Sequence, residues 1–189
     1  MIFNSYMMFL NKFIHNPKEI GSVSPSSRFL ANRMVGELPW EEMTAVAELG
    51  SGTGAITRHI ASQAGQRTRV FLFEKDEHMR SQLQRAYPGY PCFSNACHLV
   101  KLIQHQGVEQ LDAIISGLPF FNFEQELREA IVEQVADALK PGGWFVAFQY
   151  TLQMKRLLQH HFELERIRLV PLNLPPAFVY VCRKNKGIQ

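Results

Sequence analysis

The sequence predicts one α/β domain, and three features of the 189-residue chain support that prediction. Short apolar runs with strand spacing alternate with segments of helical spacing, as in proteins built on a largely parallel sheet. A glycine-rich segment joins one such strand to the helix that follows it. No repeat, linker or low-complexity segment divides the chain. Strands are expected at 45–47, 69–73, 92–96, 111–116, 144–150, 162–170 and 178–183, with helices at 55–61, 76–86, 126–139 and 151–161.

Residues 1–20 are expected to form an amphipathic helix that precedes a domain spanning residues 21–189. At about 100° per residue, the apolar side chains of residues 1–16 fall on one face of a helix. The run is too interrupted for a membrane-spanning helix, which needs about 20 apolar residues. Two alternatives stay open: the helix packs on the domain, or it lies in a membrane interface, which its aromatic and methionine content favours. The apolar residues are Ile2, Phe3, Tyr6, Met7, Phe9, Leu10, Phe13 and Ile14.

Residues 21–28 predict a turn that leads into a helix. Pro25 suits a helix start, and serine side chains there can accept hydrogen bonds from unpaired N–H groups. Simple capping is one interpretation, and a loop that closes over a bound ligand is the other. The candidate capping residues are Ser24, Ser26 and Ser27, and the apolar stripe of the helix is Phe29, Leu30, Met34 and Val35.

The segment from Glu48 to Gly54 predicts a ligand site. Glycines at 50, 52 and 54 can adopt positive φ and let a ligand lie against bare backbone at the start of a helix. The next predicted strand ends at Glu74, which is placed to bind ribose hydroxyls. The alternatives are a tight turn without a ligand and a solvated acid at a helix start.

A second group of candidate residues follows the strand at 111–116. Ligands of open α/β sheets bind beyond the carboxyl ends of the strands, so the corner of Gly117, Leu118, Pro119 and Phe120 should lie beside such a ligand. Pro119 removes a donor, which is expected to leave the preceding carbonyls free to face a substrate. Phe120 is placed to hold a cation by cation–π attraction, with packing in the core as the alternative.

Charge and cysteine content restrict the partners. The net charge of +3 is too small to indicate nucleic acid by itself, but cations crowd the C-terminal fifth and acids the region before it. One basic and one acidic face are expected, with an ordinary solvated surface as the alternative. Three cysteines without CxxC spacing indicate a reduced, cytosolic setting and no metal site. The cations include Lys155, Arg156, Arg166, Arg168, Arg183, Lys184 and Lys186.

Three motifs together resemble the bacterial phospholipid N-methyltransferase family, which methylates phosphatidylethanolamine and whose relatives act on ornithine lipids. They are Gly-Ser-Val-Ser-Pro-Ser-Ser at 21–27, Glu-Leu-Gly-Ser-Gly-Thr-Gly at 48–54 and Ile-Ser-Gly-Leu-Pro-Phe at 115–120. The resemblance runs from about residue 8 to the end of the chain. The family is in turn similar to ribosomal RNA adenine dimethyltransferases.

The resemblance implies a Rossmann-like class I methyltransferase fold, with a seven-stranded mostly parallel sheet and an antiparallel last strand. It implies S-adenosylmethionine as cofactor and a methyl-transfer corner formed by residues 116–120, with Ser116, Gly117, Leu118, Pro119 and Phe120 as the catalytic candidates. Methyltransferases of this class usually carry an acid where this sequence has Asn95, whose side-chain oxygen can still accept a hydrogen bond from adenine. The implied cofactor contacts are Ser26, Glu48, Gly50, Ser51, Gly52, Thr53, Gly54, Glu74, Lys75, Asn95, Ala96 and Ser116.

The expected reaction is methylation of a lipid headgroup amine, by a monomer that contacts an anionic membrane peripherally through residues 1–16, at the inner face of the cell membrane. No DNA partner is expected. An RNA adenine methyltransferase is one alternative, but such enzymes usually have Asn where Gly117 stands, which argues against a flat adenine amino group. A non-catalytic adenosyl-binding module is the other alternative.

Overall fold

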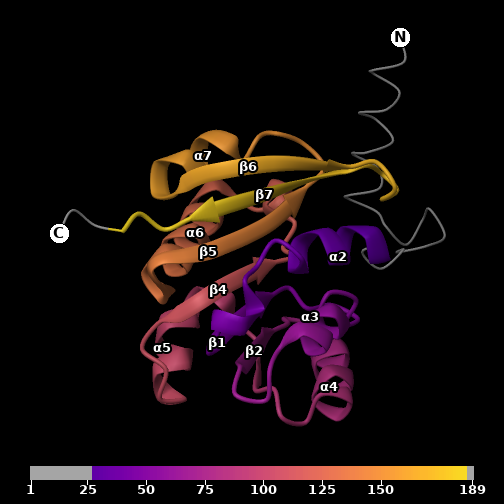
Figure 1. Ribbon diagram of the computed structural model, residues 1–189, viewed down its shortest axis with the longest axis vertical. Coiled ribbons are helices and arrows are strands. Elements are labelled where there is room, and N and C mark those ends of the chain that lie inside the picture. Colours follow the sequence, from indigo (N-terminus) through magenta and orange to yellow (C-terminus); the bar gives the residue numbers. More distant parts are fainter. Residues whose placement is uncertain (1–26, 187–189) are drawn as a thin grey trace.

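A computed structural model describes residues 27–186 as a sheet of seven strands with helices on both faces (Figure 1). The strand order is β3-β2-β1-β4-β5-β7-β6. The strands are β1 (Ala45–Leu49), β2 (Arg69–Phe73), β3 (Cys92–Phe93), β4 (Leu111–Ser116), β5 (Leu139–Gln149), β6 (Glu163–Val170) and β7 (Ala177–Arg183). The α-helices are α2 (Arg28–Val35), α3 (Thr57–Gln63), α4 (Glu77–Ala86), α5 (Leu99–His105), α6 (Gln125–Ala138) and α7 (Lys155–His161).

The sheet confirms the predicted fold class. Strands β3, β2, β1, β4 and β5 are parallel, and β7 is antiparallel to both of its neighbours, β5 and β6. Consequently β6 runs in the same direction as β5, and both of these strands end at the edge where β1, β2 and β4 end.

Two apolar clusters hold the layers together, one on each face of the sheet. On one face α2, α3 and α4 contribute side chains such as Met34, Ile60 and Leu83. On the other face α5, α6 and α7 contribute Ile103, Val132 and Leu158. The central strand β1 is buried along its whole length, because it is covered on both faces.

The amino ends of the central strands are joined by one carboxylate. Oδ2 of Asp112 accepts hydrogen bonds from the backbone N–H and the hydroxyl of Thr44, at 2.7 and 2.8 Å, and from the N–H of Ala45 at 2.9 Å. Its Oδ1 accepts a hydrogen bond from Nζ of Lys140. This carboxylate therefore ties β1, β4 and β5 together at the edge opposite the predicted site.

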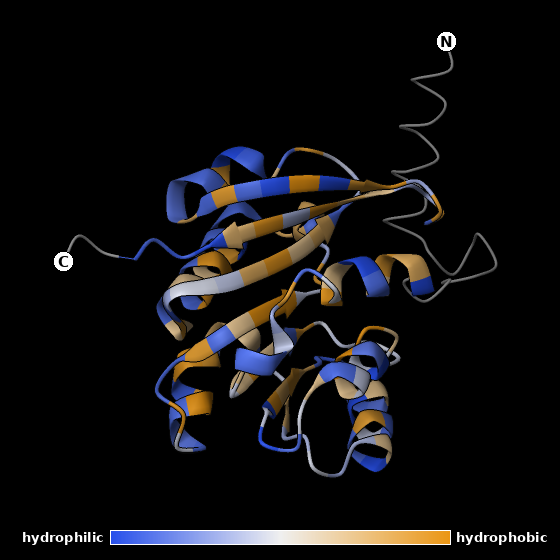
Figure 2. Cartoon of the chain, in the orientation of Figure 1, coloured by the Kyte–Doolittle hydropathy of each residue, from blue (hydrophilic) through white to orange (hydrophobic). Residues whose placement is uncertain are grey.

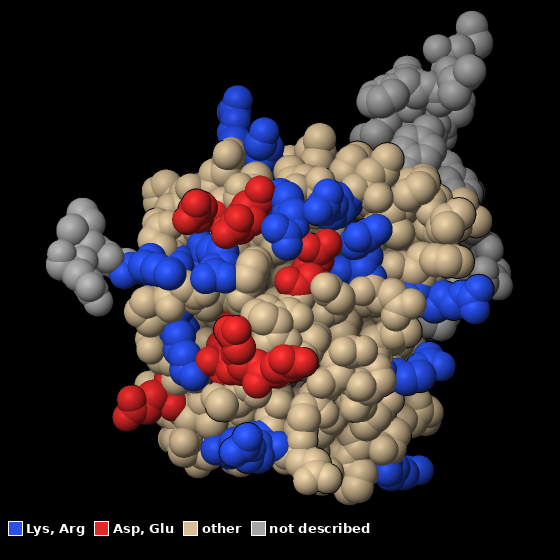
Figure 3. All heavy atoms as spheres, viewed as in Figure 1, with Lys and Arg blue, Asp and Glu red and all other residues tan. Residues whose placement is uncertain are grey.

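Three local expectations were wrong. Residues 140–143 do not separate a helix from a strand, because β5 already begins at Leu139, and the pairing of β4 with β5 shifts register there. Phe29 does not join the buried stripe of α2 and is 42% exposed. The face that carries α2 and β6 is not uniformly basic, since acidic and basic side chains lie side by side on it (Figure 3). The segment expected as a helix at 1–20 lies outside the described residues.

Within residues 27–186 the structure contains no helix with the length and apolar character that crossing a bilayer requires. The cysteines are free thiols, and Cys182 is fully buried in the core. No cluster of three or more metal-binding side chains occurs in the same part of the chain.

Candidate functional site at the carboxyl edge of the sheet

The register of the sheet brings the predicted site segments together. Leu49, the last residue of β1, pairs with Phe73 at the end of β2 and with Ser116 at the end of β4. The residues that follow these three strand ends therefore meet at one edge. They are the glycine turn, Glu74 and the corner that begins at Gly117.

The glycine turn needs glycine for conformation and for space. Gly50, Gly52 and Gly54 have φ values of 73°, 53° and 82°, in the left-handed region that other residues rarely adopt. A Cβ on Gly50 would lie 2.8 Å from Cδ2 of Leu118, whereas no heavy atom lies within 4 Å of the position that a Cβ on Gly52 would take. The turn is thus closed toward the corner at Gly50 and open beside Gly52. Of its other residues, Ser51 is buried and Thr53 is exposed.

Glu74 braces this turn from the neighbouring strand. Its Oε2 accepts a hydrogen bond from the N–H of Gly52 at 2.7 Å, and its Oε1 accepts one from the N–H of Asp76 at 2.9 Å. An ionised carboxylate has about four lone-pair sites, so hydroxyl groups of a ligand can still donate to it. Glu74 is half-buried beside the open part of the turn, and its binding of ribose stays a prediction.

Two buried polar atoms under the turn have no hydrogen-bond partner. Glu48 is fully buried at the end of β1, where its Oε2 accepts a hydrogen bond from the Thr57 hydroxyl at 2.6 Å. Its Oε1 and the hydroxyl oxygen of Ser51, a residue only 4% exposed, are unpaired. Burial raises the pKa of Glu48 to about 8, although the Thr57 hydrogen bond and the neighbouring Ser51 hydroxyl act in the opposite direction. Unpaired buried polar atoms are costly and indicate a position where a ligand or water completes the bonding.

The corner at Ser116–Phe120 packs directly on the glycine turn. The N–H of Gly117 donates to the carbonyl of Leu49 at 2.8 Å, and a Cβ on Gly117 would lie 2.9 Å from the carbonyl oxygen of Gly50. The fully buried Ser116 hydroxyl accepts from the N–H of Leu118 at 3.3 Å. Glycine is therefore required at 117 for close approach, which explains why a larger side chain is absent there.

The expectation that the carbonyls before Pro119 are free was wrong for Leu118. Its carbonyl oxygen accepts from the N–H of Phe120 at 2.9 Å and from Nε2 of Gln149 at 3.0 Å. No residue within 27–186 donates to the carbonyl oxygen of Gly117. Among the described residues, the Gly117 carbonyl thus remains as a backbone acceptor that was expected to face a substrate.

Phe120 has the packing role that was the alternative expectation. Its ring is 1% exposed and meets the ring of Phe123 edge-on, with 5.9 Å between centroids. Pro119 beside it is exposed. The aromatic ring therefore supports the corner from the core side.

The remaining predicted cofactor contacts lie at the end of β3 and after β2. Asn95 is exposed, and its Oδ1 accepts from the N–H of Cys97 at 2.9 Å, which caps the 3₁₀ helix that begins at Ala96. Lys75 is exposed next to Glu74. Ser26 lies outside the described residues, whereas Ser27 accepts a hydrogen bond from the N–H of Leu30 and caps α2 as expected.

Sequence reasoning missed Gln149 and Thr57. Gln149 is 5% exposed at the end of β5, two residues beyond Ala147, which pairs with Ser116. A polar residue ending an otherwise apolar strand was a recognisable signal, but its partner Leu118 lies 31 residues away. Thr57 holds the Glu48 carboxyl group from the first turn of α3.

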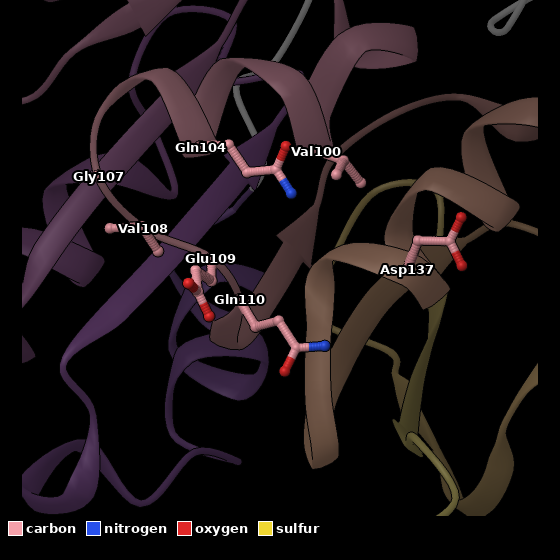
Figure 4. A pocket seen from close by; sticks show the side chains of 7 residues that line it. All are labelled: Val100, Gln104, Gly107, Val108, Glu109, Gln110 and Asp137. Atoms are coloured by element: carbon pink, nitrogen blue, oxygen red, sulfur yellow. The ribbon is translucent and has the colours of Figure 1, made fainter.

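Of two cavities in the described residues, one borders the site and the other lies away from it. One of about 310 Å³ borders the glycine turn between α3 and α4 and is lined by Thr53, Gly54, Arg58, Gln82, Leu83, Ala86 and Tyr87. The other, of about 600 Å³, lies at the opposite, amino edge between α5, the loop before β4 and the end of α6 (Figure 4). Figure 4 shows Gln104 and Asp137 on different walls of that second cavity, which includes none of the predicted site residues.

Comparisons with known proteins agree with this geometry. Residues 46–143 match the model of a family described as a methyltransferase domain. The ornithine lipid N-methyltransferase of Singulisphaera acidiphila is 33% identical over 183 residues, covering 94% of this chain and 95% of that protein. The mitochondrial dimethyladenosine transferase 2 of Drosophila melanogaster is 23% identical over 149 residues, covering 75% of this chain and 31% of that protein.

Solved structures share the fold. The 1,6-didemethyltoxoflavin-N1-methyltransferase of Burkholderia thailandensis, solved with bound 1,6-didemethyltoxoflavin and S-adenosylhomocysteine, superposes with a TM-score of 0.69 at 14% identity. The match covers 95% of this chain and 86% of that one. At this identity the likeness concerns the fold alone.

Proposed function

The chain belongs to the methyltransferase-domain family as a class I enzyme that uses S-adenosylmethionine, and we propose that it methylates the amine headgroup of a membrane lipid. The headgroup is that of phosphatidylethanolamine or of an ornithine lipid. The single observation that supports this substrate is the 33% identity, over 94% of the chain, to a protein named ornithine lipid N-methyltransferase.

The residues at the carboxyl edge fit the cofactor. Positive-φ glycines and the open space beside Gly52 leave room for a ligand against the backbone. Glu74 retains acceptor sites for ribose hydroxyls, and the unpaired atoms of Glu48 and Ser51 offer polar groups beneath the turn. Asn95, Ala96 and Lys75 would contact the adenosyl part, as the family resemblance implies. When bound, S-adenosylmethionine supplies a methyl group on a positively charged sulfur that leaves as a neutral thioether.

The corner residues would orient the acceptor amine. The Gly117 carbonyl can accept a hydrogen bond from the amine, while Gln149 and Phe120 hold the following peptide in place through the Leu118 carbonyl. The amine must lose a proton before it attacks, and desolvation in the site lowers the pKa of a cationic amine. That proton passes to solvent, so no dedicated general base is assigned. Correct alignment of nitrogen, carbon and sulfur can itself lower the barrier by up to about 7–11 kcal/mol.

The proposal includes the expected membrane attachment through residues 1–16, at the inner face of the cell membrane, and a monomeric enzyme. Residues 1–16 and Ser26 lie outside the described part of the chain. A lipid substrate supports peripheral attachment, because the headgroup is presented at a bilayer surface.

An RNA adenine methyltransferase is the second candidate, since a dimethyladenosine transferase is 23% identical over 149 residues. The chain spans 31% of the length of that protein, so the activity of that protein is weak support for the same activity in this chain. Gly117 also stands where RNA adenine methylases usually have Asn, and the close contact with the Gly50 carbonyl requires glycine there.

Incubation with radiolabelled S-adenosylmethionine and a panel of acceptors tests the proposal. The panel contains vesicles with phosphatidylethanolamine, vesicles with ornithine lipid, phosphatidylcholine vesicles as the control without a free amine, and ribosomal RNA. Label is expected in one of the two amine lipids. Label in RNA alone would reject the lipid assignment, and label in no acceptor despite cofactor binding would favour a non-catalytic adenosyl-binding module.

A further inference from the structure

The exposed apolar side chains gather at one edge of the molecule. Within residues 27–186, six large hydrophobic side chains are exposed by 40% or more, and all six lie at the carboxyl edge of the sheet. They come from the first turns of α2 and α6, the segment after β5, the end of β6 and the loop between β6 and β7. They are Phe29, Leu127, Leu152, Leu169, Leu172 and Leu174. This edge is also the one that carries the glycine turn and the Ser116 corner.

The loop between β6 and β7 holds the two most exposed leucines outward. Leu172 and Leu174 are 65% and 75% exposed, while Asn173 between them is 5% exposed. Asn173 accepts from the N–H of Ser27 at 3.1 Å and donates to the Pro175 carbonyl at 2.8 Å. The loop is therefore braced from inside against the start of α2, and its apolar side chains point away from that brace. Figure 2 shows β6 alternating hydrophilic and hydrophobic residues before it ends in a hydrophobic segment.

Arginines from α2 and β6 lie next to this apolar edge. The Glu37 carboxylate forms an ion pair with Arg166, whose Nε and Nη2 each lie 2.8 Å from Oε2. Its Oε1 lies 3.8 Å from Nε of Arg168 and 3.9 Å from Nη1 of Arg33. Exposed Arg28 adds a fourth guanidinium, 5.1 Å from the Phe29 ring centroid. The Glu37 carboxylate thus faces three cations, while Arg28 lies beside Phe29, and the side chains of Arg33 and Arg168 are about half exposed.

The acids of β6 lie at the start of the strand, farther from the loop between β6 and β7. Glu163 and Glu165 are exposed at the start of β6, and Arg166 and Arg168 follow them toward the loop. Figure 3 shows acidic side chains beside cations on the face that carries β6. Along β6, the cations therefore lie nearer than the acids to the loop where Leu172 and Leu174 protrude.

We propose that the carboxyl edge docks on an anionic phospholipid bilayer, with Leu172 and Leu174 inserted among the lipids and the arginines facing lipid phosphates. Exposed leucines flanked by arginines match the apolar and anionic layers that a bilayer presents at successive depths. The inference rests on the proposed lipid substrate, because docking by this edge brings the headgroups to the glycine turn and the Ser116 corner. It adds a contact made by the folded domain to the one expected from residues 1–16.

Sedimentation of the full chain with vesicles tests the docking surface. Vesicles contain phosphatidylethanolamine with phosphatidylglycerol, or phosphatidylcholine alone as the uncharged comparison. The Leu172→Ser/Leu174→Ser variant is expected to lower the ratio of bound to unbound protein about tenfold, because two apolar side chains no longer leave water. Binding equal to that of the wild type would overturn the proposal, as would tighter binding, which would mean that another part of the chain covers these leucines.

Charge is tested with matched arginine pairs. Arg28→Gln/Arg168→Gln removes two charges at the proposed surface, and Arg67→Gln/Arg85→Gln removes two exposed charges at the amino edge of the sheet. Only the first pair is expected to weaken binding to the anionic vesicles, and the loss should shrink as salt is added. Equal effects of the two pairs, or equal wild-type binding to both kinds of vesicle, would overturn the assignment to an anionic bilayer.

Methyl transfer to a short-chain, monomeric phosphatidylethanolamine separates this inference from the proposed function. The leucine variant should keep that activity while losing activity on vesicles. Methylation of vesicle lipid at the wild-type rate by the leucine variant would overturn the docking surface and leave the proposed function standing. Leucine-dependent vesicle binding without methylation of any lipid would overturn the proposed function and leave the docking surface standing.

Discussion

Replacing Glu48 by Gln should remove a pH dependence from the stability of the fold. Glu48 is fully buried, burial raises its pKa from 4.5 to about 8, and one of its oxygens has no hydrogen-bond partner. Between these two pH values the folded protein keeps a proton that the unfolded chain has released. The folded state then binds more protons than the unfolded state, so the free energy of unfolding falls as pH rises.

The magnitude follows from the width of that pH interval. Each pH unit within it lowers the free energy of unfolding by about 1.4 kcal/mol, which amounts to about 5 kcal/mol between pH 4.5 and pH 8. Glutamine keeps a side-chain oxygen that can accept the hydrogen bond from the Thr57 hydroxyl, and its amide group does not ionise. Glu48→Gln should therefore match the wild type near pH 4.5 and exceed its stability by several kcal/mol, about 3–5, above pH 8.

Urea unfolding at pH 5, 7 and 8.5, followed by the fluorescence of buried Trp40, measures this difference. The exposed Glu41 provides the control, because Glu41→Gln removes a carboxylate that already lies in water. Its stability should follow that of the wild type at every pH. If the free energies of unfolding of the wild type and Glu48→Gln changed with pH in parallel, the reasoning would be refuted. That result would mean that the carboxyl group of Glu48 is ionised in the folded protein at all three pH values.

Three further predictions concern the site and its support. Gln149→Met, which removes the donor to the Leu118 carbonyl while keeping the side chain's length, should lower kcat about tenfold with little change in cofactor affinity, measured by calorimetry and steady-state kinetics. Gly50→Ala should abolish cofactor binding in a protein whose circular dichroism still shows a fold, because a Cβ would lie 2.8 Å from Leu118 at a φ of 73°; unchanged affinity would contradict that account. Burial alone would raise the pKa of Asp112, but hydrogen bonds from Lys140 and from the start of β1 outweigh it and lower the pKa. Asp112→Asn should therefore cost about 1–3 kcal/mol in urea unfolding at pH 7, a loss that should fade as pH falls below 3.8, where the wild-type carboxylate takes up its proton.

The parts of the site that the sequence predicted are those set by local chain geometry. Glycines at 50, 52 and 54 permit positive φ in the turn after β1, and all three adopt it. Glu74 ends the next strand, and parallel pairing with β1 then places it beside the turn without any longer-range information. Strand ends in a parallel sheet share one edge, so predicting the strands was enough to gather the segments.

The parts that were missed depend on contacts between distant segments. The corner peptide was expected to present free carbonyls, but Gln149 from a strand 31 residues later occupies one of them. Periodicity placed Phe29 on the apolar side of its helix, yet it does not reveal that the first turn of α2 projects beyond the core. Likewise, Lys-Pro-Gly-Gly at 140–143 suggests a break, whereas pairing with β4 and β7 extends β5 through it.

The two edges of the sheet differ in how completely their polar groups are hydrogen-bonded and their apolar side chains are buried. At the amino edge, the Asp112 carboxylate accepts hydrogen bonds from three residues and ties three strands together. At the carboxyl edge, an oxygen of Glu48 and the Ser51 hydroxyl are buried without hydrogen-bond partners among the described residues, and Leu172 and Leu174 are exposed to water. Both features cost folding free energy in the protein alone, the first by lost hydrogen bonding and the second by exposed apolar surface. Ligands that bind only the folded state would offset these costs. A cofactor at the glycine turn and a bilayer at the exposed leucines should therefore each raise the free energy of unfolding.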